Sequence, residues 1–141
     1  MQKIYADVNV ILDFLLNRKP FYVEASQMVE LAKLEEIELV TDTQTLVFAF
    51  FHMSKMDKDH KAVKDRIAKL MRYVGVTSLS KEALAAALAV GKLADLEDAA
   101  QLEIAREIAA DVFVTRDLDV YKKSSFPVKS PAQFLSEFSR P

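Results

Sequence analysis

Segments with the composition of β-strands alternate with segments of helical periodicity along the whole chain. The expected strands are residues 3–6, 37–41, 74–78, 111–115 and 126–128. The expected helices are residues 8–17, 22–34, 43–53, 58–72, 95–109 and 131–138, with an alanine-rich helix after Ser80. Crossover helices between successive strands make a sheet parallel and cover both of its faces. The alternation therefore predicts a three-layer α/β/α sandwich around a parallel sheet of four to five strands.

The strand at residues 111–115 carries the clearest signal. Val112, Phe113 and Val114 form a continuous apolar run, which is typical of a central parallel strand buried on both faces. No repeat, low-complexity tract or linker interrupts the chain, so we expect a single domain over residues 1–141.

The amino-acid composition narrows the classes of protein to which the chain can belong. The chain has no cysteine, which excludes disulfides and thiolate metal sites and favours a reducing, cytoplasmic location. The first residues lack the pattern of a secretory signal, and no stretch approaches the roughly 20 apolar residues of a membrane span. We expect no association with a membrane. The net charge of −2 gives no overall attraction to nucleic acid.

Aspartates follow the expected strands. Asp7 comes after the first strand and Asp42 after the second, while Asp117 and Asp119 come after the strand at 111–115. Asp98 lies near the start of the helix that leads into that strand. Ligands of open parallel sheets bind outside the carboxyl ends of the strands, so these side chains are expected at one edge.

Carboxylates gathered at one edge raise one another's pKa and destabilise the folded chain unless a cation or a proton intervenes. Hard oxygen ligands suit Mg²⁺ or Mn²⁺. Such an ion can orient a phosphate and lower the pKa of a bound water. The pattern favours metal-dependent hydrolysis of a phosphodiester.

Each aspartate also has a simpler structural interpretation. Asp42 fits an N-cap, and Asp95 and Asp98 fit a first helical turn, where the helix dipole favours acids. Asp13 shares a helix face with Asn9. Two interpretations of Asp13 remain open: an acid on the protein surface, or a partner of the site. Spacing alone leaves the site unresolved.

Three ordered segments resemble the motifs of the PIN domain family. Residues 5–13 (YADVNVILD) resemble its opening DxNxxLD segment, residues 95–101 (DLEDAAQ) its DxxDA segment, and residues 114–119 (VTRDLD) its closing VTxDxD segment. Each motif is weak by itself, but the ordered set covers nearly the whole chain.

The resemblance implies a metal-dependent endoribonuclease that hydrolyses RNA with a metal-activated water, often as the toxin of a VapC-type toxin–antitoxin pair. The residues that match its catalytic acids are Asp7, Asp98 and Asp117. The expected ligands of Mg²⁺ or Mn²⁺ are Asp7, Asp98, Asp117 and Asp119. The expected supporting residues are Asn9, Thr115 and Arg116.

One position departs from the family pattern. PIN domains usually carry a further Glu on the helix after the second strand, and the alignment places Phe48 there. A phenyl ring cannot act as a ligand of a metal ion, so one metal, aided by Asp42, is favoured over two. The alternative function is a catalytically degenerate PIN domain that binds RNA or protein without cutting.

Residues 55–72 are basic, with seven Lys and Arg against three Asp, whereas residues 95–119 hold eight acids against two Arg. A cationic helix beside an acidic pocket would attract RNA phosphates. Lys58, Lys61 and Arg66 are the expected contacts, and a solvated helix face is the alternative.

The helix at residues 43–53 is apolar nearly all round. Its apolar residues include Leu46, Val47, Phe48, Phe50 and Phe51. Such a helix must be buried or paired, so core packing is the first expectation. A homodimer face or an antitoxin groove is the alternative.

A receiver-like signalling domain also gathers aspartates at a parallel sheet edge. That class needs a phosphoacceptor Asp at the end of a central strand, and the segment at 74–78 ends without one. The sequence therefore disfavours a receiver.

Overall fold

Five parallel strands form one sheet in the order β3-β2-β1-β4-β5. The structure, a computed structural model, describes residues 1–90 and 95–139. The strands are β1 (Gln2–Ala6), β2 (Ile37–Asp42), β3 (Gly75–Thr77), β4 (Val112–Val114) and β5 (Val128–Lys129). The expected parallel α/β sheet is confirmed.

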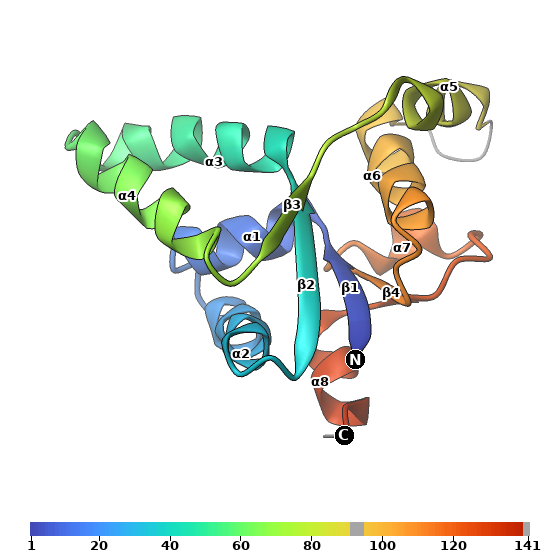
Figure 1. Cartoon of the computed structure of the whole chain (residues 1–141), viewed down its shortest axis with the longest axis horizontal. Coiled ribbons are helices and arrows are strands. Elements are labelled where there is room, and N and C mark those ends of the chain that lie inside the picture. The colour runs from blue at the N-terminus through green and yellow to red at the C-terminus, as the bar shows by residue number, and fades with distance from the viewer. Residues whose placement is uncertain (91–94, 140–141) are drawn as a thin grey trace.

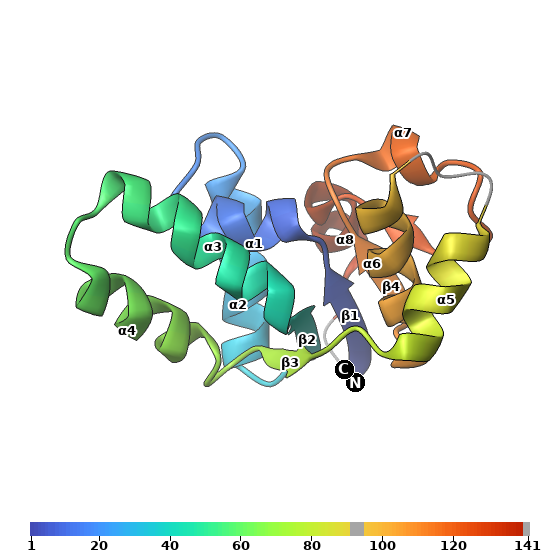
Figure 2. The same cartoon turned by 90° about the horizontal axis from the view of Figure 1, so that it is seen from above.

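Helices cover both faces of this sheet (Figure 1). They are α1 (Val8–Leu15), α2 (Tyr22–Lys33), α3 (Thr43–Met56), α4 (His60–Leu70), α5 (Lys81–Ala89), α6 (Leu96–Glu107), α7 (Leu118–Tyr121) and α8 (Pro131–Glu137). One core joins the sheet to α1, α2, α3 and α8, and a second joins it to α6 and α7. Seen from above, α3 and α4 lie on one side of the sheet and α5 and α6 on the other (Figure 2).

Several helix ends differ from their expected positions for local reasons. Helix α1 ends at Leu15 because Asn17 adopts a left-handed conformation with a φ of 57°, which asparagine tolerates. Helix α4 begins at His60, because the Asp59 side chain caps it by accepting a hydrogen bond from the Ala62 amide at 3.1 Å. The short helix α7 was not expected.

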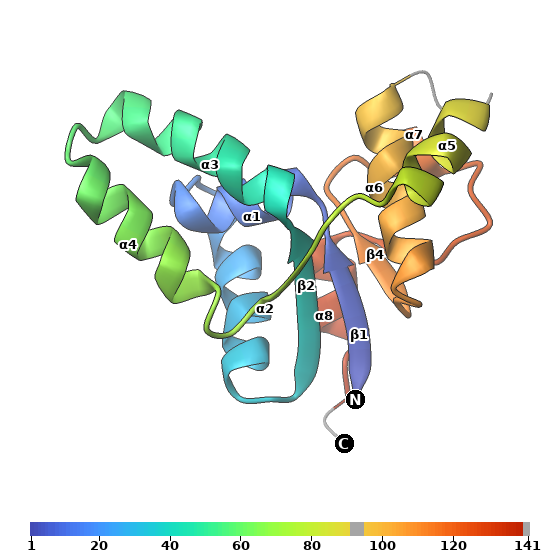
Figure 3. The same ribbon diagram turned by 45° about the horizontal axis from the view of Figure 1, so that its top comes forward.

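The expectation that α3 is buried all round is wrong. Val47, Phe48 and Phe51 are 59%, 46% and 61% exposed. The face that packs into the core consists of Leu46, Ala49 and Met53. These three residues recur at helical spacing, so only this stripe faces the sheet. Figure 3 shows α3 and α4 extending together away from the strands.

Pairing of β1 with β4 sets up the functional edge. Ala6 lies opposite Val114, and the Asp7 amide donates to the Val114 carbonyl at 2.9 Å. Side chains on β4 alternate between the two cores: Val112 and Val114 enter one and Phe113 enters the other. The residues that follow β1 and β4 are therefore held side by side.

Within residues 1–90 and 95–139, no helix has the length and apolar character needed to cross a membrane.

We predict that Phe113→Ala destabilises the fold strongly. The Phe113 ring is fully buried, with its centroid 5.6 Å from that of Tyr5 and 4.8 Å from that of Tyr121. Removal of such a ring lowers the free energy of unfolding by about 3–5 kcal/mol. Urea denaturation measures the change. Phe51→Ala is the matched control, because an exposed ring should change that free energy by less than about 0.5 kcal/mol. Equal effects of the two variants would contradict the prediction.

Candidate active site

Asp7 is the first residue after β1, and its carboxylate is almost completely buried, at 3% exposure. The Val8 amide donates to its Oδ1 at 2.7 Å, which caps α1, and the Thr115 hydroxyl donates to its Oδ2 at 2.6 Å. These two donors hold the Asp7 carboxylate in one orientation. The position of this side chain is therefore set by the edge where β1 and β4 end.

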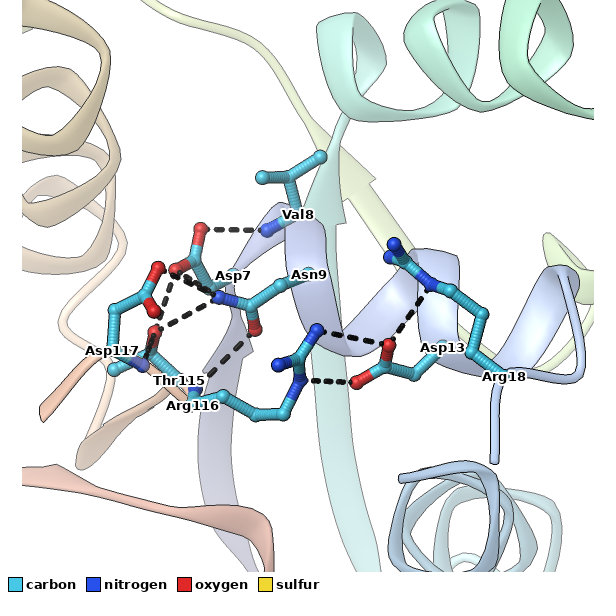
Figure 4. A network of polar contacts seen from close by, with 8 residues as sticks. All are labelled: Asp7, Val8, Asn9, Asp13, Arg18, Thr115, Arg116 and Asp117. Carbon is cyan, nitrogen blue, oxygen red and sulfur yellow. Dashed lines mark hydrogen bonds and ion pairs between the residues drawn. The ribbon is translucent and has the colours of Figure 1, made fainter. Parts of the chain in front are cut away.

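Asn9 connects the residues that follow the two strands (Figure 4). Its Nδ2 lies 3.2 Å from Asp7 Oδ2, 3.3 Å from Thr115 Oγ1 and 3.3 Å from Asp117 Oδ2. Its Oδ1 accepts from the Arg116 amide at 3.3 Å. The structure thus brings Asp7, Asn9, Thr115 and Asp117 together.

Asp98 is contacted by Tyr121, a residue that the sequence analysis did not identify. The buried Tyr121 hydroxyl lies 3.3 Å from Asp98 Oδ1 and 3.4 Å from the Asp98 carbonyl oxygen. The negative charges of Asp98 and Asp117 both raise the pKa of Asp7. Tyr121 lies on α7, whose four residues are too few to give a periodic signal.

The electrostatics of the site favour a positive ion. Burial raises the pKa of Asp7 to about 6, against the opposing hydrogen bonds from Thr115 and Val8. Burial and the neighbouring Asp95 and Asp117 also raise the pKa of Asp98, against the Tyr121 hydroxyl. Negative charge is therefore destabilised where these acids meet.

The donor chemistry fits a hard divalent cation. Carboxylate, amide and hydroxyl oxygens line the group, and Mg²⁺ needs only one or two carboxylates because it keeps several waters. Within the described ranges, 1–90 and 95–139, no three His, Cys, Asp or Glu side chains form a ready-made metal cluster. Asp7 and Asp117, which share the Asn9 amide, are accordingly the ligand pair that best fits.

Asp42 belongs to a separate buried network. Its carboxylate accepts from the Tyr5 hydroxyl, from the Thr45 amide at 2.9 Å and hydroxyl at 3.0 Å, and from Gln101 Nε2 at 3.2 Å. Its expected role as an N-cap of α3 is confirmed. These donors satisfy the carboxylate, so the suggestion that Asp42 assists the metal finds no support.

Asp13 is a buried partner of the site, and its interpretation as a surface acid is wrong. The Arg116 guanidinium donates to both of its oxygens, from Nε at 2.6 Å and from Nη2 at 3.2 Å. Arg18 Nε adds an ion pair at 3.1 Å. The Arg116 guanidinium also lies 3.8 Å from the centre of the Phe21 ring. These contacts hold the side chain of Arg116, the residue between Thr115 and Asp117.

Two expected site positions lie outside this group. Asp119 is exposed in the first turn of α7. Phe48 is half-exposed, stacks edge-on against His52 with centroids 4.3 Å apart, and lines a pocket of about 460 Å³ together with Glu97 and Gln101.

The basic residues of α4 lie on the other side of the sheet from the acidic residues of α6 (Figure 2). Helix α4 packs against α3, and α6 lies on the other side of the sheet (Figures 1 and 2). Lys58 is exposed just before α4, and Lys61 pairs with Asp65 at 3.1 Å. Arg66 donates to the Leu15 carbonyl. The acidic residues of α6 are therefore not neutralised by α4.

The chain is thus a parallel α/β sandwich with acids that follow β1 and β4. The chain belongs to the PIN domain family, whose model matches residues 3–119. It is 23% identical over 124 residues to Ribonuclease VapC1 of Aquifex aeolicus, and these residues make up 85% of this chain and 85% of that protein.

Two solved structures share the fold. VapBC2 from Rickettsia felis, bound to a DNA fragment from its promoter, aligns with a TM-score of 0.68 at 12% identity, over 92% of this chain and 98% of that chain. The sarcin–ricin loop cleaving toxin VapC20 of Mycobacterium tuberculosis aligns with a TM-score of 0.64 at 13% identity, over 86% and 95%.

We predict that Asp7 titrates near neutral pH in metal-free buffer. Its pKa of about 6 in the folded chain exceeds the ordinary 3.8, so folding takes up a proton between these values. The stability that Asp7 contributes is complete below the lower value and is lost as pH rises through the upper one. A ¹³C NMR titration of the Asp7 carboxyl should give a midpoint near 6. Asp7→Asn identifies the resonance, and a midpoint at or below 3.8 would contradict the prediction.

Proposed function

We propose that this chain is a Mg²⁺- or Mn²⁺-dependent endoribonuclease of the VapC toxin type. The observation that carries the proposal is the buried Asp7 carboxylate, whose pKa is raised by burial and by Asp98 and Asp117 at one sheet edge. The likeness to Ribonuclease VapC1 supports RNA as the substrate. The likeness to VapC20, a toxin that cleaves the sarcin–ricin loop, supports the same conclusion.

Asp7 and Asp117 would hold the ion, with Asp98 as a further acid of the pocket. The ion would supply positive charge against the phosphate and lower the pKa of a water that it binds. Thr115 and Asn9 hold the Asp7 carboxylate, and Asn9 also reaches Asp117, so both acids are oriented before an ion arrives. The Tyr121 hydroxyl orients Asp98 in the same way. Asp119 would act only at the rim.

The exposed Lys58 and Lys61 would contact the RNA backbone away from the cut, because α4 lies on the other side of the sheet from α6. Partner proteins would include an antitoxin, as in the VapBC2 complex, and a second copy of the chain. The exposed Val47, Phe48 and Phe51 on α3 offer apolar surface for such contacts.

We predict that purified protein cleaves single-stranded RNA with Mn²⁺ and stops when EDTA is added. Asp7→Asn should lower the rate by more than roughly 100-fold, because even the partners of metal ligands contribute about 10- to 100-fold. Gel-resolved cleavage of a labelled RNA gives the rates. Asp65→Asn is the matched control, since Asp65 lies exposed on α4 and pairs only weakly with Lys61. Equal rates in Asp7→Asn and wild type would overturn the assignment of the site.

Phe48 supports a second candidate function, a degenerate PIN domain that binds RNA or protein without cutting. The ring occupies the position at which the family usually has an acid, and in the structure it lines a pocket with Glu97.

We predict that calorimetry distinguishes the two functions. A nuclease should bind Mn²⁺ in the micromolar to millimolar range and lose that binding in the Asp7→Asn/Asp117→Asn double variant. No Mn²⁺ binding by the wild-type chain would favour the degenerate domain.

A further inference from the structure

A second pocket begins one residue away from the acids. It has a volume of about 530 Å³ and is lined by Asp13, Pro20, Phe21, Glu24, Arg116 and Pro131, among others. Arg116 stands between Thr115 and Asp117, so its backbone belongs to the acid group while its side chain forms a wall of the pocket. The volume lies within the usual range for small-ligand sites, about 300–1,000 Å³.

The Phe21 ring lines this pocket and packs against Arg116. The Arg116 guanidinium lies 3.8 Å from the ring centre, and Asp13 anchors that guanidinium through both carboxylate oxygens. Phe21 nevertheless remains 41% exposed. The ring thus presents exposed apolar surface at the pocket, with the Arg116 guanidinium packed against it.

The charges of the pocket suit a nucleobase better than a phosphate. Arg116 and Arg18 both pair with the buried carboxylate of Asp13. Glu24 adds a second negative charge to the lining, so no net positive charge is left for a phosphate. Pro20 and Pro131 contribute apolar walls. A carboxylate can accept hydrogen bonds from the amino group of a base such as cytosine. Single-stranded RNA is commonly held by stacking of its bases on aromatic rings.

We propose that Phe21 is a stacking platform for an RNA base that flanks the scissile phosphate, and that Glu24 favours a base with an amino group. The inference rests on the proposed function, because it supplies the substrate contacts of the same site. Arg116 acts as a positioning residue that holds the platform against β4.

Phe21→Trp provides a direct test, because the chain contains no tryptophan and the new indole would be its sole fluorophore of that kind. In EDTA, which prevents cleavage, a cytidine hexanucleotide should strongly quench this indole by stacking. An abasic oligonucleotide of the same length, which retains the phosphates, should leave the emission unchanged. Phe51→Trp is the matched control, since Phe51 is also exposed but lies on α3.

A kinetic measurement separates substrate contact from a structural role. Phe21→Ala should raise KM about tenfold, the effect of losing one base–aromatic stack, while kcat stays close to wild type. Phe21→Tyr keeps the ring and should restore KM. Failure of Phe21→Tyr to restore it would overturn the proposal.

The outcomes for the platform and for the nuclease are distinguishable. Active wild-type enzyme with no quenching in Phe21→Trp would overturn the platform and leave the nuclease intact. Base-dependent quenching without any cleavage would support the platform while the nuclease fails. Emission that responds to a partner protein but not to RNA would assign the pocket to protein binding and overturn the proposal.

Discussion

Parallel pairing of β1 with β4 is the constraint on which the acidic site depends. Because Ala6 lies opposite Val114, the next residues, Asp7 and Thr115, emerge together at the same sheet edge. The chain then turns into α1 on one side and toward α7 on the other, so Asn9 and Asp117 reach the same place. The two strands are separated by about a hundred residues in sequence, and only the completed sheet brings these groups into contact.

That geometry buries a carboxylate beside two others and stabilises it only with neutral donors. Thr115, the Val8 amide and Asn9 orient Asp7, but none of them carries a positive charge. In contrast, the equally buried Asp13 is paired with Arg116 and Arg18, and Asp42 is satisfied by Tyr5, Thr45 and Gln101. The three buried aspartates near this edge are therefore stabilised in different ways: Asp7 by neutral donors, Asp13 by arginines, and Asp42 by hydroxyl and amide groups. Burial raises the pKa of Asp7 to about 6.

The sequence predicted the sheet because its signals are local: an apolar run at β4 and the alternation of strand and helix periodicities. It also predicted that Asp7 and Asp117 lie at one edge, since residues that follow parallel strands meet there whatever their separation. The choice of Asp98 came from the family resemblance and stays a prediction. The sequence could not place α4 relative to α6, because the side of the sheet on which a helix packs depends on tertiary contacts. It could not decide whether Asp13 was buried, because its partner Arg116 lies 103 residues away. The short helix that carries Tyr121 left no periodic pattern to detect.

The arginine between Thr115 and Asp117 explains how the acid group can be rigid while it is mutually repulsive. Repulsion between Asp7 and Asp117 would favour withdrawal of the closing segment, which joins β4 to only one turn of helix. Arg116 opposes that withdrawal, because its amide donates to Asn9 and its guanidinium donates to both oxygens of Asp13 on the same helix, α1. The favourable ion pair of Arg116 with Asp13 thus lies next to the unfavourable pair of acids, Asp7 and Asp117. It holds the backbone that leads to Asp117. Stacking of Arg116 on Phe21 extends this support to the start of α2. The apolar pocket and the acidic site therefore share Arg116, whose amide contacts Asn9 and whose guanidinium contacts Phe21.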